Sequence, residues 1–373
     1  MEDNKKIAVL GANYQYTSFY KQAVALGYKI IAFGRAEDDH VCAQYAEKFY
    51  PISFREQEKI LEICKKEQVA GVTSFLIESA LPHVYYISRG LGVPCNSPEC
   101  EALTANKFTM RQRLREEGVS IPKYKIVHSI EEIGEIDLPV IMKPSDSGGS
   151  RGITLIHHHE GLEKAFERAI AFSPSHSVLI EQYIGGREFS IESISYEGKH
   201  YVLQITDKVT TGDPYFVELE HHQPADLSSH KRDEIKKLTI DMLDALKVDY
   251  GASHTEIKLD DNGLPYIIEM GARMGGGYIS SDLVRLSTGY DFVKGVLEVA
   301  TGSFTTPVIR NEHHSGVFFL SEETKAKVLP YIEHRESYPE IIAADIYSDI
   351  KPIKCNSDRA GFFIYQKEKR MII

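Results

Sequence analysis

Two glutamates have the type and spacing expected of a metal site. Glu256 and Glu269 lie on two alternating segments on either side of an Asp-Asp-Asn-Gly turn. A hairpin with a two-residue Asn-Gly loop of type I′ places Glu256 directly opposite Glu269. If Leu259 instead pairs with Leu264, the glutamates are diagonal neighbours. Both registers put the carboxylates on one face, because side chains alternate along a strand.

Like charges that face each other across two strands destabilise the pair, so another group must compensate them. Mg²⁺, or Mn²⁺ in its place, takes oxygen ligands, and we therefore interpret Glu256 and Glu269 as metal ligands. The alternative is that one glutamate pairs with a lysine such as Lys258. Arg273 follows directly, ahead of the three glycines 275–277. Arginine binds phosphate or carboxylate oxygens through two nitrogens, so this segment suits a triphosphate and a small carboxylate substrate. The alternative for Arg273 is an exposed side chain in a flexible loop.

A second motif joins a lysine to a loop rich in glycine and serine. An apolar strand at 139–143 ends in Lys143, and the loop 145–152 contains Ser147, Gly148, Gly149 and Ser150. Glycines allow backbone N–H groups to approach an anion closely, and the lysine adds a positive charge for phosphate. The spacing differs from a Walker A loop. The alternative is a hairpin turn with a solvated lysine.

A third motif places a carboxylate at each end of a linker. The segment 178–182 contains Glu181, and the next strand begins with Glu188. A linker between two lobes can present backbone groups to an adenine edge. Glu181 could accept a hydrogen bond from the adenine amine, and Glu188 could hold ribose hydroxyls. The alternative is that both carboxylates face water.

The elements that position these residues differ along the chain. The first hundred residues alternate short apolar strands with helices, which predicts a parallel sheet with helices on its faces. The predicted strands are 6–10, 29–33 and 69–75, and the predicted helices are 17–26 and 60–66. The first turn, Gly-Ala-Asn-Tyr-Gln-Tyr, lacks the GxGxxG pattern, which argues against an NAD-dependent oxidoreductase.

A boundary is predicted near residue 100, where Pro94 and Pro98 flank a turn-rich segment. One helix is predicted from about 100 to 117. The region 101–302 contains hairpin patterns, with a separate lobe at about 121–183, and 303–373 is predicted to form a small C-terminal subdomain. The fold class is therefore a mixture of α/β and α+β, with a Rossmann-like domain at 1–100.

The composition excludes several classes. The chain has 373 residues and a formal net charge of −11, which disfavours general binding to nucleic acids. It lacks an apolar run long enough to span a membrane and a secretory signal, and its five cysteines show no metal-ligand spacing. We expect reduced thiols and a cytoplasmic location.

In order and spacing, the motifs resemble the ATP-grasp superfamily over about residues 5–300. The form GARMGGG is most similar to L-amino-acid ligases and to carboxylate-amine ligases of the carbamoyl-phosphate-synthase-like type. The resemblance implies an ATP-grasp fold with a two-lobed ATP-binding core and a loop that closes over the triphosphate. One departure concerns Gly271, because many members have an asparagine metal ligand at that position. A glycine side chain cannot bind a second metal ion.

The resemblance also implies a role for each matched residue. Lys107 and Lys143 would contact the ATP phosphates, and Tyr183 and Ile184 would read adenine together with Glu181. The other implied contacts are ribose by Glu188, Mg²⁺ by Glu256 and Glu269, and the transferring phosphoryl group by Arg273.

The implied reaction activates a carboxylate as an acyl phosphate, which an amine then attacks to form an amide or peptide bond, with release of ADP and phosphate. The expected partners are a small carboxylate and an amine, and a homodimer is possible. Two alternatives stay open: a purine-pathway-like enzyme that activates formate or bicarbonate, and a nucleotide-binding regulatory protein without turnover.

Overall fold

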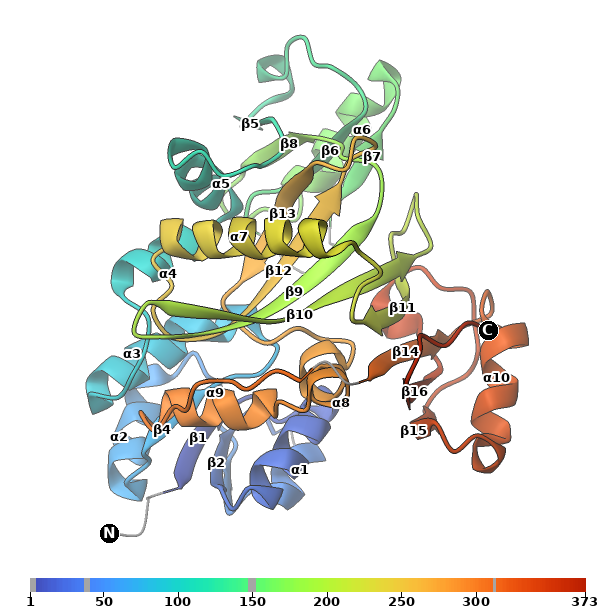
Figure 1. Ribbon diagram of the computed structural model, residues 1–373. Helices are drawn as coiled ribbons and strands as arrows, with labels where there is room; N and C mark the ends of the chain where they lie inside the picture. Colours follow the sequence, from blue (N-terminus) through green and yellow to red (C-terminus); the bar gives the residue numbers. More distant parts are fainter. Residues whose placement is uncertain (1–4, 37–40, 147–151, 311–312) are drawn as a thin grey trace.

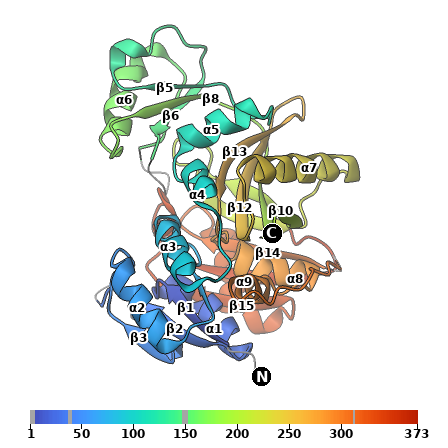
Figure 2. The same ribbon diagram turned by 90° about the vertical axis from the view of Figure 1, so that its left-hand side faces the viewer.

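The computed structural model describes residues 5–36, 41–146, 152–310 and 313–373. Three sheets organise this part of the chain (Figure 1). A parallel sheet lies at one end, a small antiparallel sheet lies at the other, and a large antiparallel sheet lies between them. Figure 2 shows the same order from the side. The predicted mixture of α/β and α+β structure is confirmed.

The N-terminal sheet is parallel, as the sequence predicts. Its order is β3-β2-β1-β4, from strands β1 (Lys6–Leu10), β2 (Lys29–Phe33), β3 (Lys48–Tyr50) and β4 (Gly71–Thr73). Alternate residues of β1 enter two different apolar cores, so the sheet is buried on both faces. The covering helices are α1 (Thr17–Ala25), α2 (Gln57–Glu67), α3 (Leu81–Leu91) and, from much later in the chain, α9 (Phe292–Ala300).

The single helix predicted at about 100–117 is wrong, because the chain forms two helices there. α4 (Pro98–Thr104) ends before Asn106, and α5 (Lys107–Glu116) begins after it. The Asn106 side chain caps α5 by accepting a hydrogen bond from the N–H of Phe108 at 2.8 Å. The break places Lys107 in the first turn of α5, where its N–H donates to the carbonyl of Ser145 at 3.0 Å.

The small antiparallel sheet has the order β5-β8-β6-β7, from β5 (Tyr124–Val127), β6 (Val140–Pro144), β7 (Thr154–Ile156) and β8 (Val178–Gln182). Helix α6 (Leu162–Ile170) packs on it. Lys143 pairs with Leu179, and Glu181 pairs with Ile141. Lys143 and Glu181 are therefore diagonal neighbours on one face.

The large sheet has the order β13-β12-β9-β10-β11-β14-β16-β15. Its strands are β9 (Glu188–Tyr196), β10 (Lys199–Thr210), β11 (Glu218–Gln223), β12 (Gly251–Leu259), β13 (Pro265–Gly271), β14 (His314–Leu320), β15 (Ile341–Ile346) and β16 (Gly361–Lys367). The sheet continues through the boundary predicted at residue 303, because β11 pairs with β14.

The remaining helices are α7 (Ser229–Ala245), α8 (Val284–Thr288), α10 (Lys325–Glu333) and the π-helix η6 (Ile279–Leu283). Short 3₁₀ helices are η1 (Tyr14–Tyr16), η2 (Val41–Tyr45), η3 (Glu78–Ala80), η4 (Ile130–Glu132), η5 (His159–Gly161), η7 (Arg335–Ser337) and η8 (Asn356–Asp358). Within the described ranges, no helix is both long and apolar enough to cross a bilayer.

Candidate active site

The β12–β13 hairpin brings two glutamates face to face. Glu256 lies directly opposite Glu269, as one of the two predicted registers requires. The pairing shifts by one residue next to Glu256, so Ile268 forms a bulge on β13. The two carboxylates therefore share one face of the hairpin.

The type I′ turn predicted for this hairpin is wrong. Leu259 pairs with Pro265, which leaves the loop 260–264 between the strands. A type I′ turn needs a positive φ at both central residues. Gly263 has a φ of +77°, but the φ of Asn262 is not positive. The Asp260 side chain instead closes the loop by accepting a hydrogen bond from the N–H of Leu264 at 2.8 Å.

A lysine pairs with each glutamate of the hairpin, although neither is Lys258. Lys107 lies 2.6 Å from Glu269, and Lys208 lies 2.7 Å from Glu256. Burial acts to raise the pKa of both carboxyls, but these lysines outweigh it and lower the pKa. Two ionised carboxylates on one face form a donor set that a hard divalent cation fits.

Within the described ranges, no group of three or more His, Cys, Asp or Glu side chains surrounds a possible metal position. A cation at Glu256 and Glu269 would therefore take its other ligands from water and nucleotide phosphates, as Mg²⁺ commonly does.

Lys208 is a central residue that the sequence analysis missed. Its ammonium contacts three carboxylates: Glu188 at 2.6 Å, Glu256 at 2.7 Å and Glu218 at 3.1 Å. Burial acts to lower the pKa of Lys208, but the carboxylates outweigh it and raise the pKa well above its ordinary value. We call these four residues the carboxylate cluster. The signal in the sequence was a lysine inside a long, mostly buried strand, β10.

A second group of charges has the opposite balance. The buried Glu181 carboxylate forms ion pairs with Arg111 and Lys143. Burial acts to raise the pKa of Glu181, but the two cations outweigh it and lower the pKa to about 2. Arg111 also donates to the carbonyl of Ile268, at the bulge of β13. We call Arg111, Lys143 and Glu181 the cationic cluster. Arg111 was not predicted.

The predicted adenine and ribose contacts lie close to both clusters. Tyr183 and Ile184 lie between β8 and β9, and the Tyr183 N–H already donates to the carbonyl of Pro139 at 3.1 Å. The Lys258 ammonium lies 4.9 Å from the centre of the Tyr183 ring and 3.9 Å from Glu188. The predicted phosphate-loop residues 147–150 lie outside the described residues.

Arg273 lies in the loop that follows β13. Its Nη1 donates to the carbonyl of Met274 at 3.0 Å, and its buried Nε has no hydrogen-bond partner among the described residues. A Cβ atom on Gly271 would lie 3.3 Å from the Arg273 Cγ. Gly271 therefore leaves room for the Arg273 side chain beside it. An asparagine at 271 would offer an oxygen ligand, but its Cβ would also crowd the Arg273 side chain.

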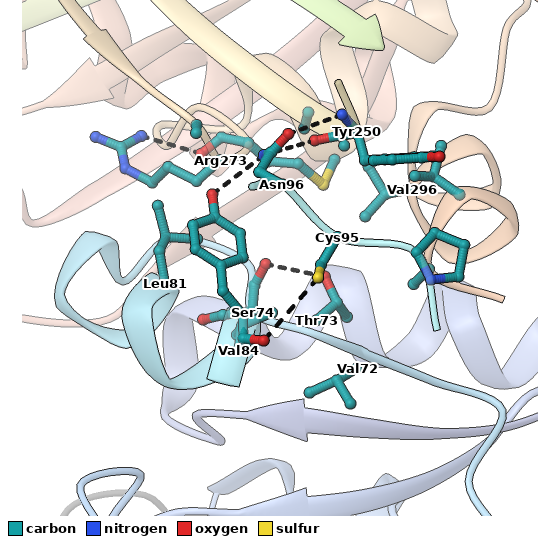
Figure 3. A pocket seen from close by; sticks show the side chains of 18 residues that line it. Val72, Thr73, Ser74, Leu81, Val84, Cys95, Asn96, Tyr250, Arg273 and Val296 are labelled. Carbon is teal, nitrogen blue, oxygen red and sulfur yellow. Dashed lines mark hydrogen bonds between the residues drawn. The ribbon is translucent and has the colours of Figure 1, made fainter. Parts of the chain in front are cut away.

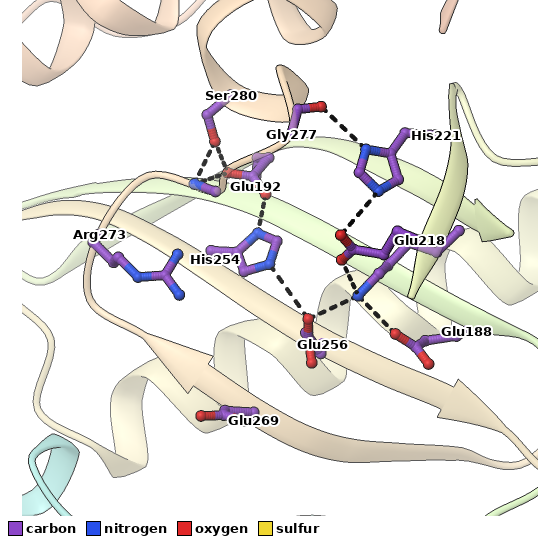
Figure 4. A network of polar contacts seen from close by, with 12 residues as sticks. Glu188, Glu192, Glu218, His221, His254, Glu256, Glu269, Arg273, Gly277 and Ser280 are labelled. Atoms are coloured by element: carbon purple, nitrogen blue, oxygen red, sulfur yellow. Dashed lines mark hydrogen bonds and ion pairs between the residues drawn. The ribbon is translucent and has the colours of Figure 1, made fainter. Parts of the chain in front are cut away.

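A buried chain of polar residues supports Glu256 (Figure 4). His254 lies between Glu192, to which its Nδ1 is hydrogen-bonded, and Glu256, whose Oε1 is 3.7 Å from its Nε2. Ser280 donates to the other Glu192 oxygen. Burial acts to lower the pKa of His254, but Glu192 outweighs it and raises the pKa to about 9. The protonated imidazole of His254 therefore places a positive charge beside the Glu256 carboxylate and helps to fix its position.

The glycine run has a packing role. A Cβ atom on Gly275 would lie 2.4 Å from the His254 Nδ1, and one on Gly277 would lie 2.7 Å from the His221 Cε1. By contrast, a Cβ on Gly276 would meet Leu76 at an ordinary 3.7 Å. Two of the three glycines are thus explained by the close approach of buried histidines, a reason that the sequence analysis did not give.

Arg359, which lies just before β16, reaches the site from the C-terminal part of the chain. This guanidinium lies 2.7 Å from the Glu218 carboxylate and 3.7 Å from the centre of the Phe319 ring.

His221 Nδ1 lies 3.1 Å from the carbonyl of Gly277, and burial lowers the His221 pKa to about 3. A neutral His221 therefore donates to Gly277.

A small pocket lies between the N-terminal sheet and the large sheet (Figure 3). Asn96 fixes this junction, because its side chain accepts from the N–H groups of Asp249 and Tyr250 and donates to the carbonyl of Tyr250. Arg273 lines the pocket, but its guanidinium points away from Cys95 and Asn96 in Figure 3. Arg273 thus belongs both to the lining of this pocket and to the charged site.

The two opposed carboxylates have the chemistry that suits a cation, and the flanking cations and the unpartnered Arg273 Nε have the chemistry that suits phosphate oxygens. Residues 136–282 match the ATP-grasp domain family, and the chain contains an ATP-grasp domain with the ATP-grasp fold.

The chain is similar to dapdiamide A synthase of Enterobacter agglomerans, with 27% identity over 195 residues, which are 49% of this chain and 45% of that protein. It is also similar to the carbamoyl phosphate synthase large chain of Buchnera aphidicola, with 25% identity over 346 residues, 83% of this chain and 31% of that protein. The matches span about half or less of these relatives.

Among solved structures, an L-amino acid ligase from Bacillus licheniformis superimposes with a TM-score of 0.83 and 25% identity. The superposition covers 99% of this chain and 95% of that one. The similarity thus extends into the residues after 282, which the domain match does not reach.

Proposed function

We propose that this protein is an ATP- and Mg²⁺-dependent ligase that activates a carboxylate as an acyl phosphate and joins it to an amine. The observation that carries the proposal is the face-to-face pair Glu256 and Glu269 between the two charged clusters. The similarity to an amino-acid ligase over nearly the whole chain supports the choice of reaction.

Each residue of the site has a role in positioning or charge neutralisation. Glu256 and Glu269 would hold Mg²⁺, which when bound neutralises charge on the phosphates. Lys107 and Lys143 bind phosphate oxygens, and Arg273 stabilises the charge that develops on the transferring phosphoryl group. A substrate carboxylate oxygen attacks the terminal phosphorus, and the bond to the ADP oxygen breaks.

The acyl phosphate is then a good electrophile. The amine nitrogen attacks its carbonyl carbon, a tetrahedral intermediate forms, and phosphate leaves as the amide forms and the amine loses a proton. The protein's contribution is to orient the reactants and to exclude water from the acyl phosphate.

The nucleotide contacts are also part of the proposal. Tyr183 and Ile184 would face adenine, and Glu188 would hold the ribose. Both oxygens of Glu181 already pair with cations, so its contact with the adenine amine would require Lys143 to turn toward phosphate. While Glu181 keeps its pair with Lys143, its role toward the nucleotide is to position that lysine.

The test is hydroxamate formation, because hydroxylamine traps an acyl phosphate whatever the natural amine is. The enzyme would be incubated with ATP, Mg²⁺, hydroxylamine and a panel of L-amino acids and small carboxylic acids. Hydroxamate with an equal amount of ADP supports the proposal. AMP and pyrophosphate would exclude an acyl phosphate, whereas turnover with formate or bicarbonate alone would favour the purine-pathway type of reaction. ATP binding without turnover on any acid would favour a regulatory protein.

A further inference from the structure

Lys258 contacts three elements at one end of the site. It lies on β12, where it pairs directly with Glu188 of β9. Its ammonium lies 3.9 Å from the Glu188 carboxylate, 4.9 Å from the centre of the Tyr183 ring and 5.9 Å from the centre of the Phe216 ring. Tyr183 belongs to the linker between β8 and β9, and Phe216 belongs to the loop between β10 and β11. One lysine thus connects the linker to that loop.

The two rings help to hold Lys258, because its carboxylate is shared. Glu188 has a closer cation in Lys208, at 2.6 Å. The Lys258 side chain is only 13% exposed, and burial lowers its pKa, an effect that Glu188 opposes. An ammonium that is shielded from water is attracted more strongly to the face of an aromatic ring than one in water. The rings therefore stabilise charge for which the shared carboxylate compensates only in part.

The loop that carries Phe216 turns this ring inward. Residues 213–215 are exposed, whereas Phe216 is partly buried beside Tyr183, with the ring centres 6.5 Å apart. Phe216 has a φ of +50°, which is a strained conformation for a bulky residue. Such strain persists only where surrounding contacts outweigh it. The ring contacts with Tyr183 and Lys258 contribute to that compensation.

The same loop also reaches the small antiparallel sheet. Asp213 lies 3.6 Å from His157, which directly follows β7. Both side chains are about half exposed, so this contact is the weaker of the two. The loop 211–217 therefore bridges from the large sheet to the small sheet, next to the linker that connects them covalently.

We propose that Lys258 and Phe216 are positioning residues that close the nucleoside end of the site and slow the release of the nucleotide. The inference rests on the proposed function, which puts adenine beside Tyr183 and ribose beside Glu188, and it adds the control of nucleotide exchange. Lys258 contacts both of these residues and so fixes their relative position. Opening this end requires the loop to separate from the linker, which breaks the ring contacts of Lys258.

The test measures how fast ADP leaves the protein. The protein would be loaded with tritiated ADP and Mg²⁺, and release would be followed by rapid filtration after addition of excess unlabelled ADP. Lys258→Met keeps a long side chain without the charge and should release ADP about 3- to 30-fold faster than the wild type. Lys258→Arg keeps a cation over the rings and should stay within about threefold of the wild type.

The loop provides independent variants. Phe216→Asn removes the ring but keeps a residue that tolerates a positive φ, and it should release ADP about 3- to 10-fold faster. The double variant with Lys258→Met should be faster by less than the product of the two single effects, because both remove one shared contact. His157→Ala removes the weaker bridge and should speed release by at most about fivefold.

Steady-state kinetics separates positioning from a general structural role. In the hydroxamate assay, Lys258→Met should raise KM for ATP, leave KM for the acid unchanged and keep kcat within a few-fold. A merely structural role would instead lower the melting temperature and raise both KM values. Recovery of KM for ATP in Lys258→Arg is the expected companion result.

Two matched controls come from similar side chains outside this contact. The Lys199 ammonium lies 5.3 Å from the centre of the Tyr201 ring near the start of β10, so Lys199→Met removes the same kind of contact elsewhere. Tyr215→Asn removes the exposed aromatic side chain that precedes Phe216 in the loop. Both variants should release ADP at the wild-type rate.

Several results would overturn the inference. Unchanged release in both Lys258→Met and Phe216→Asn would do so while the proposed function stands, and so would equally fast release in Lys199→Met. A loss of kcat with unchanged release would assign Lys258 to the reaction itself. If ADP binds but no acid yields hydroxamate, the proposed function fails and the release rates still decide this inference. If the wild type does not bind ADP, both are rejected.

Discussion

The cationic cluster and the carboxylate cluster flank the same hairpin with opposite charge balance. In the cationic cluster, Arg111 and Lys143 share one carboxylate, whereas in the carboxylate cluster Lys208 is shared by three. Among its own members the first cluster has positive charge in excess, which suits phosphate oxygens. The second has negative charge in excess among its members, which Arg359, His254 and Lys258 beside it partly offset. Under the proposed function, the hairpin next to both clusters would hold the metal ion and the phosphates of one nucleotide.

The largest effect is expected when the β12–β13 hairpin between the clusters loses one of its two carboxylates. Glu269→Ala should lower the rate of ADP formation by about 10³-fold, because the metal position between the clusters is lost. The measurement is hydroxamate and ADP formation under saturating ATP and Mg²⁺.

The control for this prediction is Glu340→Ala, which removes a surface partner of Lys367 and should change little. A Glu269→Ala protein with a rate within tenfold of the wild type would contradict the role given to the hairpin.

The two clusters should also differ in stability when each loses its lysine. Lys208→Met leaves three carboxylates without their shared cation and should cost about 3–5 kcal/mol of unfolding free energy. Lys143→Met leaves Glu181 paired with Arg111 and should cost less, about 1–3 kcal/mol. Urea unfolding of the matched variants measures both, and equal costs would show that the charge imbalance has no energetic consequence.

The glycine loop beside the hairpin offers a smaller test. Gly275→Ala should lower the unfolding free energy by about 1–3 kcal/mol, because the new Cβ would overlap His254. The matched variant Gly276→Ala has ordinary space and should stay within about 1 kcal/mol of the wild type. Thermal unfolding of the two proteins compares them, and an equal loss would contradict the packing role.

The sequence predicted the facing glutamates of the β12–β13 hairpin but missed the partners in the two clusters. Strands β1 and β2 agree with their predicted bounds, and Glu256 faces Glu269, because these features depend on short segments that lie close together in the sequence. Lys208 and Arg111 were missed because partners of both lie far away in the sequence, with Glu256 48 residues from Lys208 and Glu181 70 residues from Arg111. The Ser280–Glu192 bond, for example, joins residues 88 apart in the chain.

Other differences between the predictions and the structure arise from contacts that leave no periodic pattern in the sequence. The break at Asn106 depends on a side-chain cap inside an otherwise helical pattern. The glycines at 275 and 277 looked suited to phosphate, yet the close histidines explain them without a ligand. The positions of the predicted site residues follow from these contacts, whereas their roles in binding ATP stay predictions.

The smallest expected effect concerns pH and the cationic cluster. Arg111 and Lys143 lower the Glu181 pKa to about 2, so the ionised carboxylate stabilises the fold above about pH 4.5. That contribution should fall as the pH drops from 4.5 toward 2. The difference in unfolding free energy between wild type and Glu181→Gln should therefore shrink, by less than about 1.4 kcal/mol per pH unit. Urea unfolding at pH 6, 4 and 3 measures it, and a constant difference would contradict the lowered pKa.

The pairing of β11 with β14 limits how this chain can be shortened or recombined. A protein that ends near residue 302 would lose β14 and leave the backbone N–H and C=O groups of β11 open along its length. Unpaired strands of this kind attract other chains and promote aggregation. Exchange of C-terminal segments between relatives would therefore succeed only if the donor also supplied a strand whose register matches β11.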